Sequence, residues 1–163
     1  MKWLLILVLA TSVTSCAPTT HIYIVRHAEK ATNDPKDPEL TSDGVLRANV
    51  LALKLRSLNI KKIYATNFKR TTATAKPLSD AIHIPVENYH RDTSGLMMRH
   101  LVISNLNALV VGHSNTVLPL LDSLNISHAK KDIGDNEYDN LFIINIKKGQ
   151  VIGLQEQKYG PKS

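Results

Sequence analysis

Short apolar segments with the composition of buried strands alternate with segments of helical periodicity through most of this 163-residue chain. The strand-like segments are rich in β-branched residues, and helix-length stretches separate most of them. This alternation is typical of crossover units, which build a parallel sheet with helices on both faces. We therefore expect one α/β domain, a three-layer α/β/α sandwich with a mostly parallel central sheet. The expected strands are 21–26, 61–66, 85–89, 108–112, 140–147 and 151–157, and the expected helices are 43–58, 68–82, 96–105 and 117–124.

The first expected helix has the clearest signals. Thr41 is a good N-terminal cap, and Asp43 places a negative charge near the positive end of the helix. Pro77 in the second expected helix predicts a kink or a late helix start. The segment 148–150 predicts a hairpin between the last two strands. The apolar face of the first helix is expected to consist of Val45, Ala48, Leu51, Leu55 and Leu58.

The composition fits one globular domain with a basic net charge. Hydrophobic residues make up 43% of the chain, and the formal net charge is +6. A basic balance is compatible with nucleic acid, a membrane surface, an anionic substrate or simply a solvated surface. The chain contains no arginine-rich run, no basic stretch interleaved with aromatic residues and no zinc-finger spacing. We therefore expect no nucleic-acid partner.

The N-terminal segment has a different character from the rest. Lys2 is followed by an apolar run over 3–10, and small residues then lead to Cys16, the only cysteine. The run is shorter than the roughly 20 residues that span a bilayer, and it has the size of a signal-peptide core. The segment resembles a bacterial lipoprotein signal. That resemblance implies a signal peptide over 1–15, a lipidated tether over 16–20, and an extracytoplasmic protein anchored to the cell envelope. The alternatives are an uncleaved anchor and a buried helix with an incidental cysteine.

Four polar side chains lie where expected strands end. Arg26 and His27 follow the first strand, Arg70 comes shortly after the second, and His113 follows the strand 108–112. The carboxyl ends of parallel strands share one edge of a sheet, and ligands bind there. Arginine presents a fixed fork of donors that matches phosphate oxygens. A neutral histidine can attack phosphorus. These residues predict a pocket for a phosphate dianion.

Four segments resemble the motifs of the histidine phosphatase superfamily, which is related to phosphoglycerate mutases. They appear in the order of the family, and the resemblance covers nearly all of 21–157. It implies a phosphatase in which His27 becomes phosphohistidine and water then hydrolyses the intermediate. It also implies that Arg26, Arg70 and His113 hold the phosphoryl group, that Asn33 assists, and that no metal or organic cofactor is needed. The segments are Arg26-His27-Ala28-Glu29, 40–48, 64–75 and Val111-Gly112-His113-Ser114, with Ala28 and Thr66 standing where relatives usually have glycine and serine.

The implied mechanism also needs a residue that protonates the leaving group. The resemblance implies a carboxylate between the last two of these segments, 64–75 and 111–114, where Glu87 is the first choice and Asp92 the second. The run 135–139 is interpreted as a solvated loop that could border the pocket. The short interval between Arg70 and His113 leaves little room for a cap over the substrate. An open site favours a phosphatase that acts on phosphomonoesters or phosphoramidates, in a small molecule or a phosphoprotein.

Other interpretations of the chain stay open. It could be a non-catalytic phosphate-binding module of the same fold, or a phosphoglycerate-type mutase, which the chain length disfavours. Zinc bound by His27 and His113 is disfavoured because no further ligand lies at a suitable spacing. The phosphatase domain is expected over 21–157, followed by a C-terminal tail over 158–163. The sequence indicates no oligomeric state.

Overall fold

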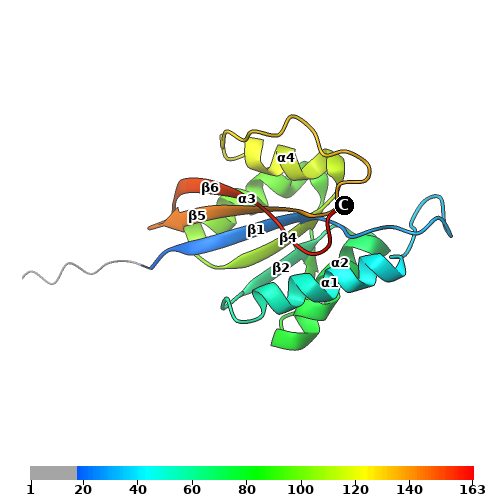
Figure 1. The fold of residues 1–163 in the computed structure, drawn as a ribbon. Helices are drawn as coiled ribbons and strands as arrows, with labels where there is room; N and C mark the ends of the chain where they lie inside the picture. Colours follow the sequence, from blue (N-terminus) through cyan, green and yellow to red (C-terminus); the bar gives the residue numbers. More distant parts are fainter. Residues whose placement is uncertain (1–17) are drawn as a thin grey trace, which may run out of the picture.

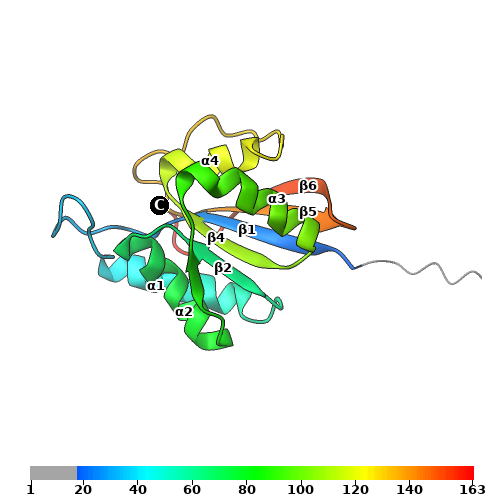
Figure 2. The ribbon, with the colours of Figure 1, turned by 180° about the vertical axis from the view of Figure 1, so that it is seen from behind.

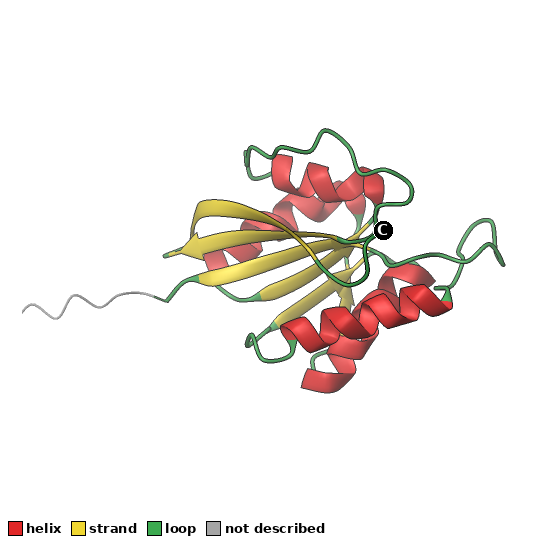
Figure 3. Cartoon of the chain, in the orientation of Figure 1, coloured by secondary structure: helices red, strands yellow, loops and turns green. Residues whose placement is uncertain are grey.

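A computed structural model describes residues 18–163, and these residues form a single sheet with helices on both faces (Figures 1 and 3). The predicted signal peptide and Cys16 lie outside the described residues. The strands are β1 (Thr20–Arg26), β2 (Lys62–Ala65), β3 (Val86–Asn88), β4 (Ala108–Gly112), β5 (Asn140–Lys147) and β6 (Gln150–Lys158). The helices are α1 (Ser42–Leu55), α2 (Lys69–Ile82), α3 (Ser94–Ser104) and α4 (Ser114–Asp122), with a short 3₁₀ turn η1 (Arg91–Thr93).

The sheet has six strands in the order β3-β2-β4-β1-β5-β6. Strands β3, β2, β4 and β1 are mutually parallel. Strand β5 runs antiparallel to β1, and β6 pairs with β5 as a hairpin. The expected mostly parallel sheet with a closing hairpin is therefore confirmed. Its four parallel strands all end at the same edge, which is where the predicted phosphate-binding residues occur.

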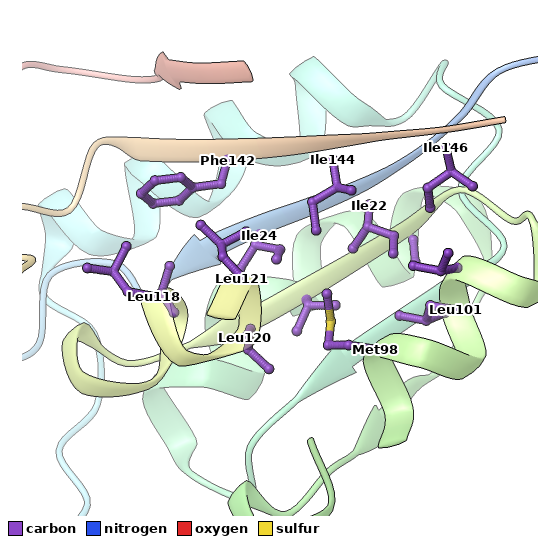
Figure 4. Packing of buried hydrophobic residues seen from close by; sticks show 14 of the residues in the cluster. Ile22, Ile24, Met98, Leu101, Leu118, Leu120, Leu121, Phe142, Ile144 and Ile146 are labelled. Atoms are coloured by element: carbon purple, nitrogen blue, oxygen red, sulfur yellow. The ribbon is translucent and has the colours of Figure 1, made fainter. Parts of the chain in front are cut away.

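The helices cover both faces of the sheet, with α1 and α2 on one side and α3 and α4 on the other (Figures 1 and 2). Each face has its own core, because successive side chains of a strand point to opposite faces. In β1, Ile22 and Ile24 pack with α3 and α4, as Figure 4 shows, whereas Tyr23 and Val25 pack with α1 and α2. Burial on both faces explains why β1 is apolar over its whole length.

The inward face of α1 differs from the prediction. Val45 and Leu58 are exposed, at 49% and 36%, and the helix ends at Leu55 before Leu58 is reached. Gly44 and Arg47 are buried in their place. Gly44 is required because a Cβ at this position would collide with the carbonyl oxygen of Glu29. Ala48, Leu51 and Leu55 are buried as predicted, so apolar periodicity gave the centre of the buried face correctly and missed only Gly44 and Arg47, which carry no apolar signal.

The other two differences concern helix starts. Helix α2 runs from Lys69 through Pro77 without the late start that the proline predicted. Helix α4 begins at Ser114, three residues before the predicted start. The reason is a capping interaction, in which the His113 N–H donates to the Thr116 hydroxyl oxygen at 2.8 Å. This cap places the first turn of α4 directly beside His113.

The segment between α2 and β4 contains only β3, η1 and α3, which belong to the sheet and its covering layer. The prediction of no cap insertion is therefore confirmed. At the other end of the domain, Tyr159 follows β6 and is buried, so the packed structure extends past the predicted boundary at residue 157. Within residues 18–163, no helix has the length and apolar character needed to cross a membrane.

Candidate active site

A pocket of about 950 Å³ lies at the carboxyl ends of β1, β2 and β4. It brings together four of the predicted site residues, Arg26, His27, Arg70 and His113. The rings of the two histidines meet edge to face with centroids 5.3 Å apart. The full lining consists of Arg26, His27, Lys30, Thr66, Asn67, Phe68, Arg70, Tyr89, His90, Arg91, His113, Ser114, Asn115, Thr116, Asp135, Asn136 and Tyr138.

His27 lies at the floor of this pocket, directly after β1. Its N–H donates to the carbonyl oxygen of Gly112 at 2.9 Å, and only 3% of the residue is exposed. The ring Nδ1 lies 2.8 Å from the Ala28 carbonyl oxygen. Because a carbonyl can only accept, Nδ1 carries the proton and Nε2 keeps its lone pair. Burial lowers the pKa of His27 to about 3, and the positive charge of Arg26 acts in the same direction. His27 is therefore neutral at physiological pH.

His113, which follows β4, belongs to a chain of hydrogen bonds that reaches Thr66 at the end of β2. The Arg70 Nη2 group lies 3.4 Å from His113 Nδ1, which must accept since a guanidinium only donates. His113 Nε2 then donates to the Thr66 hydroxyl at 2.8 Å. The Thr66 hydroxyl donates in turn to Thr71 at 3.1 Å. Burial, followed by the charge of Arg70, lowers the pKa of His113 to about 4. The Thr66 hydroxyl thus fixes the tautomer of His113, because it accepts from Nε2.

The two arginines retain donors that nothing in the protein accepts. Arg26 Nη1 donates to the Gly134 carbonyl at 2.7 Å, but its Nε is buried without a hydrogen bond. Arg70 Nε and Nη1 are also buried without one, although Nη1 lies 3.5 Å from an Asp37 carboxylate oxygen. Buried polar groups normally find partners, and unpaired ones carry a free-energy cost. Three such N–H groups beside His27 and His113 define a site for an oxygen-rich anion.

The amino-terminal end of α4 adds to the positive character of the pocket. Ser114 and Asn115, in the first turn of this helix, both line the pocket. The first N–H groups of a helix lack partners within the helix, and the helix dipole favours negative charge at that end. This arrangement is a common anion-binding site.

Two aromatic residues of the site were missed by the sequence analysis. The Tyr138 ring lies 4.2 Å from the Arg26 guanidinium and 6.0 Å from the His27 ring. The Phe68 ring lies 4.4 Å from the Arg70 guanidinium and 5.1 Å from the His113 ring. Each aromatic ring therefore holds one arginine beside one histidine. Phe68 lies within the motif segment 64–75 and could have been singled out there, whereas no sequence signal marks Tyr138.

The segment 134–138, hereafter the rim loop, forms one wall of the pocket. It connects α4 to β5 and contributes Asp135, Asn136 and Tyr138 to the lining. The expectation that 135–139 could border the pocket is confirmed. The loop is attached to the floor because Arg26 Nη1 donates to two of its carbonyl oxygens, those of Gly134 and Glu137.

The structure does not bring Glu87, Asp92 or Asn33 to the lining of the pocket. Glu87 pairs in register with Tyr64 of β2, and its carboxylate accepts from Lys62 at 2.6 Å. Lys62 begins β2, whereas the pocket lies beyond the end of β2, so the structure does not place Glu87 in the pocket. Asp92 is exposed in η1, and Asn33 is exposed in the loop before α1. Spacing along the chain could not show which way these side chains face.

Residues 18–163 contain no group of three or more His, Cys, Asp or Glu side chains placed to hold a metal ion. The residues present offer a neutral imidazole with a free lone pair, donors for an anion, and a second histidine held by Thr66 and Arg70. This set can bind a tetrahedral dianion and attack it with nitrogen.

Comparisons with known proteins agree with this geometry. Residues 22–91 match the model of the histidine phosphatase superfamily (branch 1). Among solved structures, the protein histidine phosphatase SixA complexed with tungstate is similar with a TM-score of 0.67 at 16% identity, over 85% of this chain and 97% of that one. Mycobacterial glucosyl-3-phosphoglycerate phosphatase is similar with a TM-score of 0.61 at 14% identity, over 87% and 99%. No curated protein matches the sequence.

A third solved structure, a putative phosphohistidine phosphatase SixA from Agrobacterium tumefaciens, has a TM-score of 0.59 at 16% identity, over 87% of this chain and 98% of that one. Identities this low speak for the fold alone. The chain thus has the fold of the histidine phosphatases, and its residues 22–91 match the model of their superfamily.

Proposed function

We propose that this protein is a phosphatase that hydrolyses its substrate through a phosphohistidine on His27. The observation that carries the proposal is the set of three buried guanidinium nitrogens on Arg26 and Arg70 that make no hydrogen bond within the described protein, beside the neutral ring of His27. These donors match the oxygens of a phosphoryl group. The fold and the match to the family model support the same activity.

In the first step, Nε2 of His27 attacks phosphorus, and the bond to the leaving group breaks with its electron pair on the leaving atom. Arg26, Arg70 and the first turn of α4 stabilise the charge on the phosphoryl oxygens, while the proton of His27 stays on Nδ1 and is donated to the Ala28 carbonyl. In the second step, water attacks phosphorus and the P–N bond breaks. The product is inorganic phosphate, and His27 returns to its neutral form.

The arrangement favours hydrolysis over mutase chemistry. No cap encloses the pocket in the described chain, so water has direct access to a phosphohistidine on His27. The absence of Glu87 from the pocket leaves no carboxylate of that segment to protonate a poor leaving group. Phosphoramidates and phosphomonoesters with good leaving groups need little assistance of this kind. They are the substrate classes that fit the site.

The test is direct capture of the phosphoenzyme. The full-length protein is incubated briefly with a ³²P-labelled phosphoramidate, denatured in alkali and examined for label, since phosphohistidine survives base and is lost in acid. We expect label on the parent and on His100→Asn, a control on the exposed surface of α3, and none on His27→Asn. Label that persists in His27→Asn would refute the mechanism. A parent that binds phosphate yet takes no label would be a binding module.

We also propose that the protein is anchored to the bacterial cell envelope through lipid on Cys16. The support is the sequence pattern before that residue, a lysine, an apolar run and small residues. Replacing Cys16 by serine is expected to move the protein from the membrane fraction to the soluble fraction. Unchanged membrane association in Cys16→Ser would contradict the proposal.

A further inference from the structure

The charge of the pocket lining is strongly one-sided. Of the described residues that line it, four are permanently cationic, namely Arg26, Lys30, Arg70 and Arg91, and only Asp135 is acidic. A single carboxylate in such surroundings is distinctive because every other charged group attracts the phosphate. Asp135 repels the phosphoryl oxygens, so it has to serve a different part of the substrate.

The position of Asp135 is fixed by the loop around it. The carbonyl oxygen of the preceding Gly134 accepts from Arg26, and the Gly134 N–H donates to the Glu137 carboxylate at 3.2 Å. That carboxylate also accepts from Lys130 at 2.7 Å. Burial lowers the pKa of Arg26, and the negative charge of Asp135 opposes this shift, so the two side chains lie within electrostatic reach of each other. The Asp135 carboxylate is therefore held close to the phosphate-binding arginine.

Depth in the pocket separates Asp135 from the nucleophile. His27 lies at the floor, with 3% of the residue exposed, whereas Asp135 is exposed at the mouth. In an in-line displacement the leaving group departs on the side opposite the nucleophile. With His27 at the floor, that side is the mouth of the pocket. Asp135 is thus positioned for the leaving group, while Arg26 and Arg70 serve the phosphoryl oxygens.

We propose that the Asp135 carboxylate accepts a hydrogen bond from an N–H of a nitrogen leaving group, and that the substrate class is a phosphoramidate whose nitrogen group is protonated, and therefore cationic, before the P–N bond breaks. This inference rests on the proposed phosphatase function. A carboxylate has no proton to give to an alkoxide, but it stabilises a protonated nitrogen heterocycle or amine. It also disfavours substrates with an anionic leaving group or anionic substituents.

The reaction balances with this role. A substrate imidazole attached through one nitrogen takes a proton from solvent on its other nitrogen, and Asp135 accepts from that N–H. His27 Nε2 then forms its bond to phosphorus, and the P–N bond to the substrate breaks. The electron pair returns to the substrate nitrogen, so the leaving group departs as neutral imidazole. No oxidant, metal or additional acid is required.

The experiment compares two phosphodonors on the full-length protein, phosphoimidazole with a nitrogen leaving group and p-nitrophenyl phosphate with a phenolate. In Asp135→Asn we expect kcat/KM for phosphoimidazole to fall by about 10- to 100-fold, the range for losing a charge-assisted hydrogen bond. The loss for p-nitrophenyl phosphate is expected to stay below about threefold. The matched control is Asp132→Asn, an exposed acid before the same loop that does not line the pocket, which should match the parent on both donors.

The outcomes separate the inference from the function on which it rests. Equal losses on both donors, together with weaker inhibition by inorganic phosphate, would mean that Asp135 acts only through Arg26 and would overturn the inference. Unchanged selectivity in Asp135→Asn would overturn it as well. In both cases label on His27 of the parent would leave the phosphatase function intact. A parent that neither donor labels would instead defeat the proposed function.

Discussion

The floor and the rim of the pocket are built in different ways. The floor consists of residues at the ends of β1, β2 and β4, where Arg26, His27 and Thr66 are almost fully buried. The rim loop is largely exposed, and the contacts of Arg26 with its Gly134 carbonyl and its Tyr138 ring attach it to the floor. Side chains on regular elements are held more firmly than those on loops. The difference assigns phosphoryl chemistry to the floor and recognition of the leaving group to the rim.

The floor also carries a free-energy cost that the rim does not. It keeps two neutral histidines beside two arginines, and three guanidinium N–H groups stay buried without partners. Neither feature stabilises the fold. Features of this kind are expected at functional sites, where residues that bind a ligand are kept although they lower the stability of the fold. The floor should therefore respond to mutation and pH more strongly than the rim.

The largest effect is expected for Arg70, which belongs to the floor. Arg70→Ala should lower kcat/KM for p-nitrophenyl phosphate by about 10²- to 10³-fold, the usual cost of losing one donor to transition-state charge. Arg70→Lys should recover only part of the rate, since lysine lacks the planar fork. Lys69→Ala is the neighbouring control, because its exposed side chain does not line the pocket. A loss below tenfold in Arg70→Ala would remove Arg70 from the phosphate site.

The second prediction concerns pH. His27 has a folded-state pKa of about 3, below its ordinary value of 6.5, so the unfolded chain binds a proton that the folded chain rejects between these values. The stability that comes from a neutral His27 is present above pH 6.5 and is lost as pH falls toward 3. We expect the Tm of the parent to fall more steeply than that of His27→Asn between pH 6.5 and 4. His100→Asn should follow the parent. Parallel curves for the parent and His27→Asn would contradict the burial of a neutral ring.

A smaller effect is expected for Tyr138, the rim-loop residue whose ring packs against Arg26 of the floor. Tyr138→Leu removes the ring 4.2 Å from Arg26 and should weaken inhibition by inorganic phosphate by about 3- to 10-fold, the value of one cation–π contact. Tyr138→Phe keeps the ring and should behave as the parent does. If both variants lose the same affinity, the hydroxyl group matters rather than the stacking on Arg26.

The smallest effect is expected for Glu87. Glu87→Gln should leave kcat/KM within about twofold of the parent for both an alkyl and an aryl phosphate, because its ion pair with Lys62 lies at the other end of β2. A selective loss on the alkyl phosphate would show that Glu87 reaches the leaving group after all. Such a result would place a proton donor for the leaving group on β3.

Much of the fold was predictable because its signals are local. Each strand of the sheet was expected near its observed position, since buried parallel strands such as 108–112 are continuous apolar runs. The burial of Arg47 in α1 was not predictable in the same way. Arg47 is 2% exposed and donates to the Glu29 carboxylate and to the Tyr159 carbonyl, two partners far away in the sequence. Helical periodicity has no means of indicating a buried ion pair.

The amino-acid sequence by itself determined the parallel sheet and the strand ends at which Arg26, His27, Arg70 and His113 occur. Parallel strands bring their carboxyl ends together, so these positions converge without further information. Only the tertiary structure decided which acid faces the pocket. Glu87 turns to Lys62, while the irregular rim loop brings Asp135 to the mouth. The direction of a side chain on an edge strand or a loop depends on contacts made across the fold, and chain spacing does not encode them.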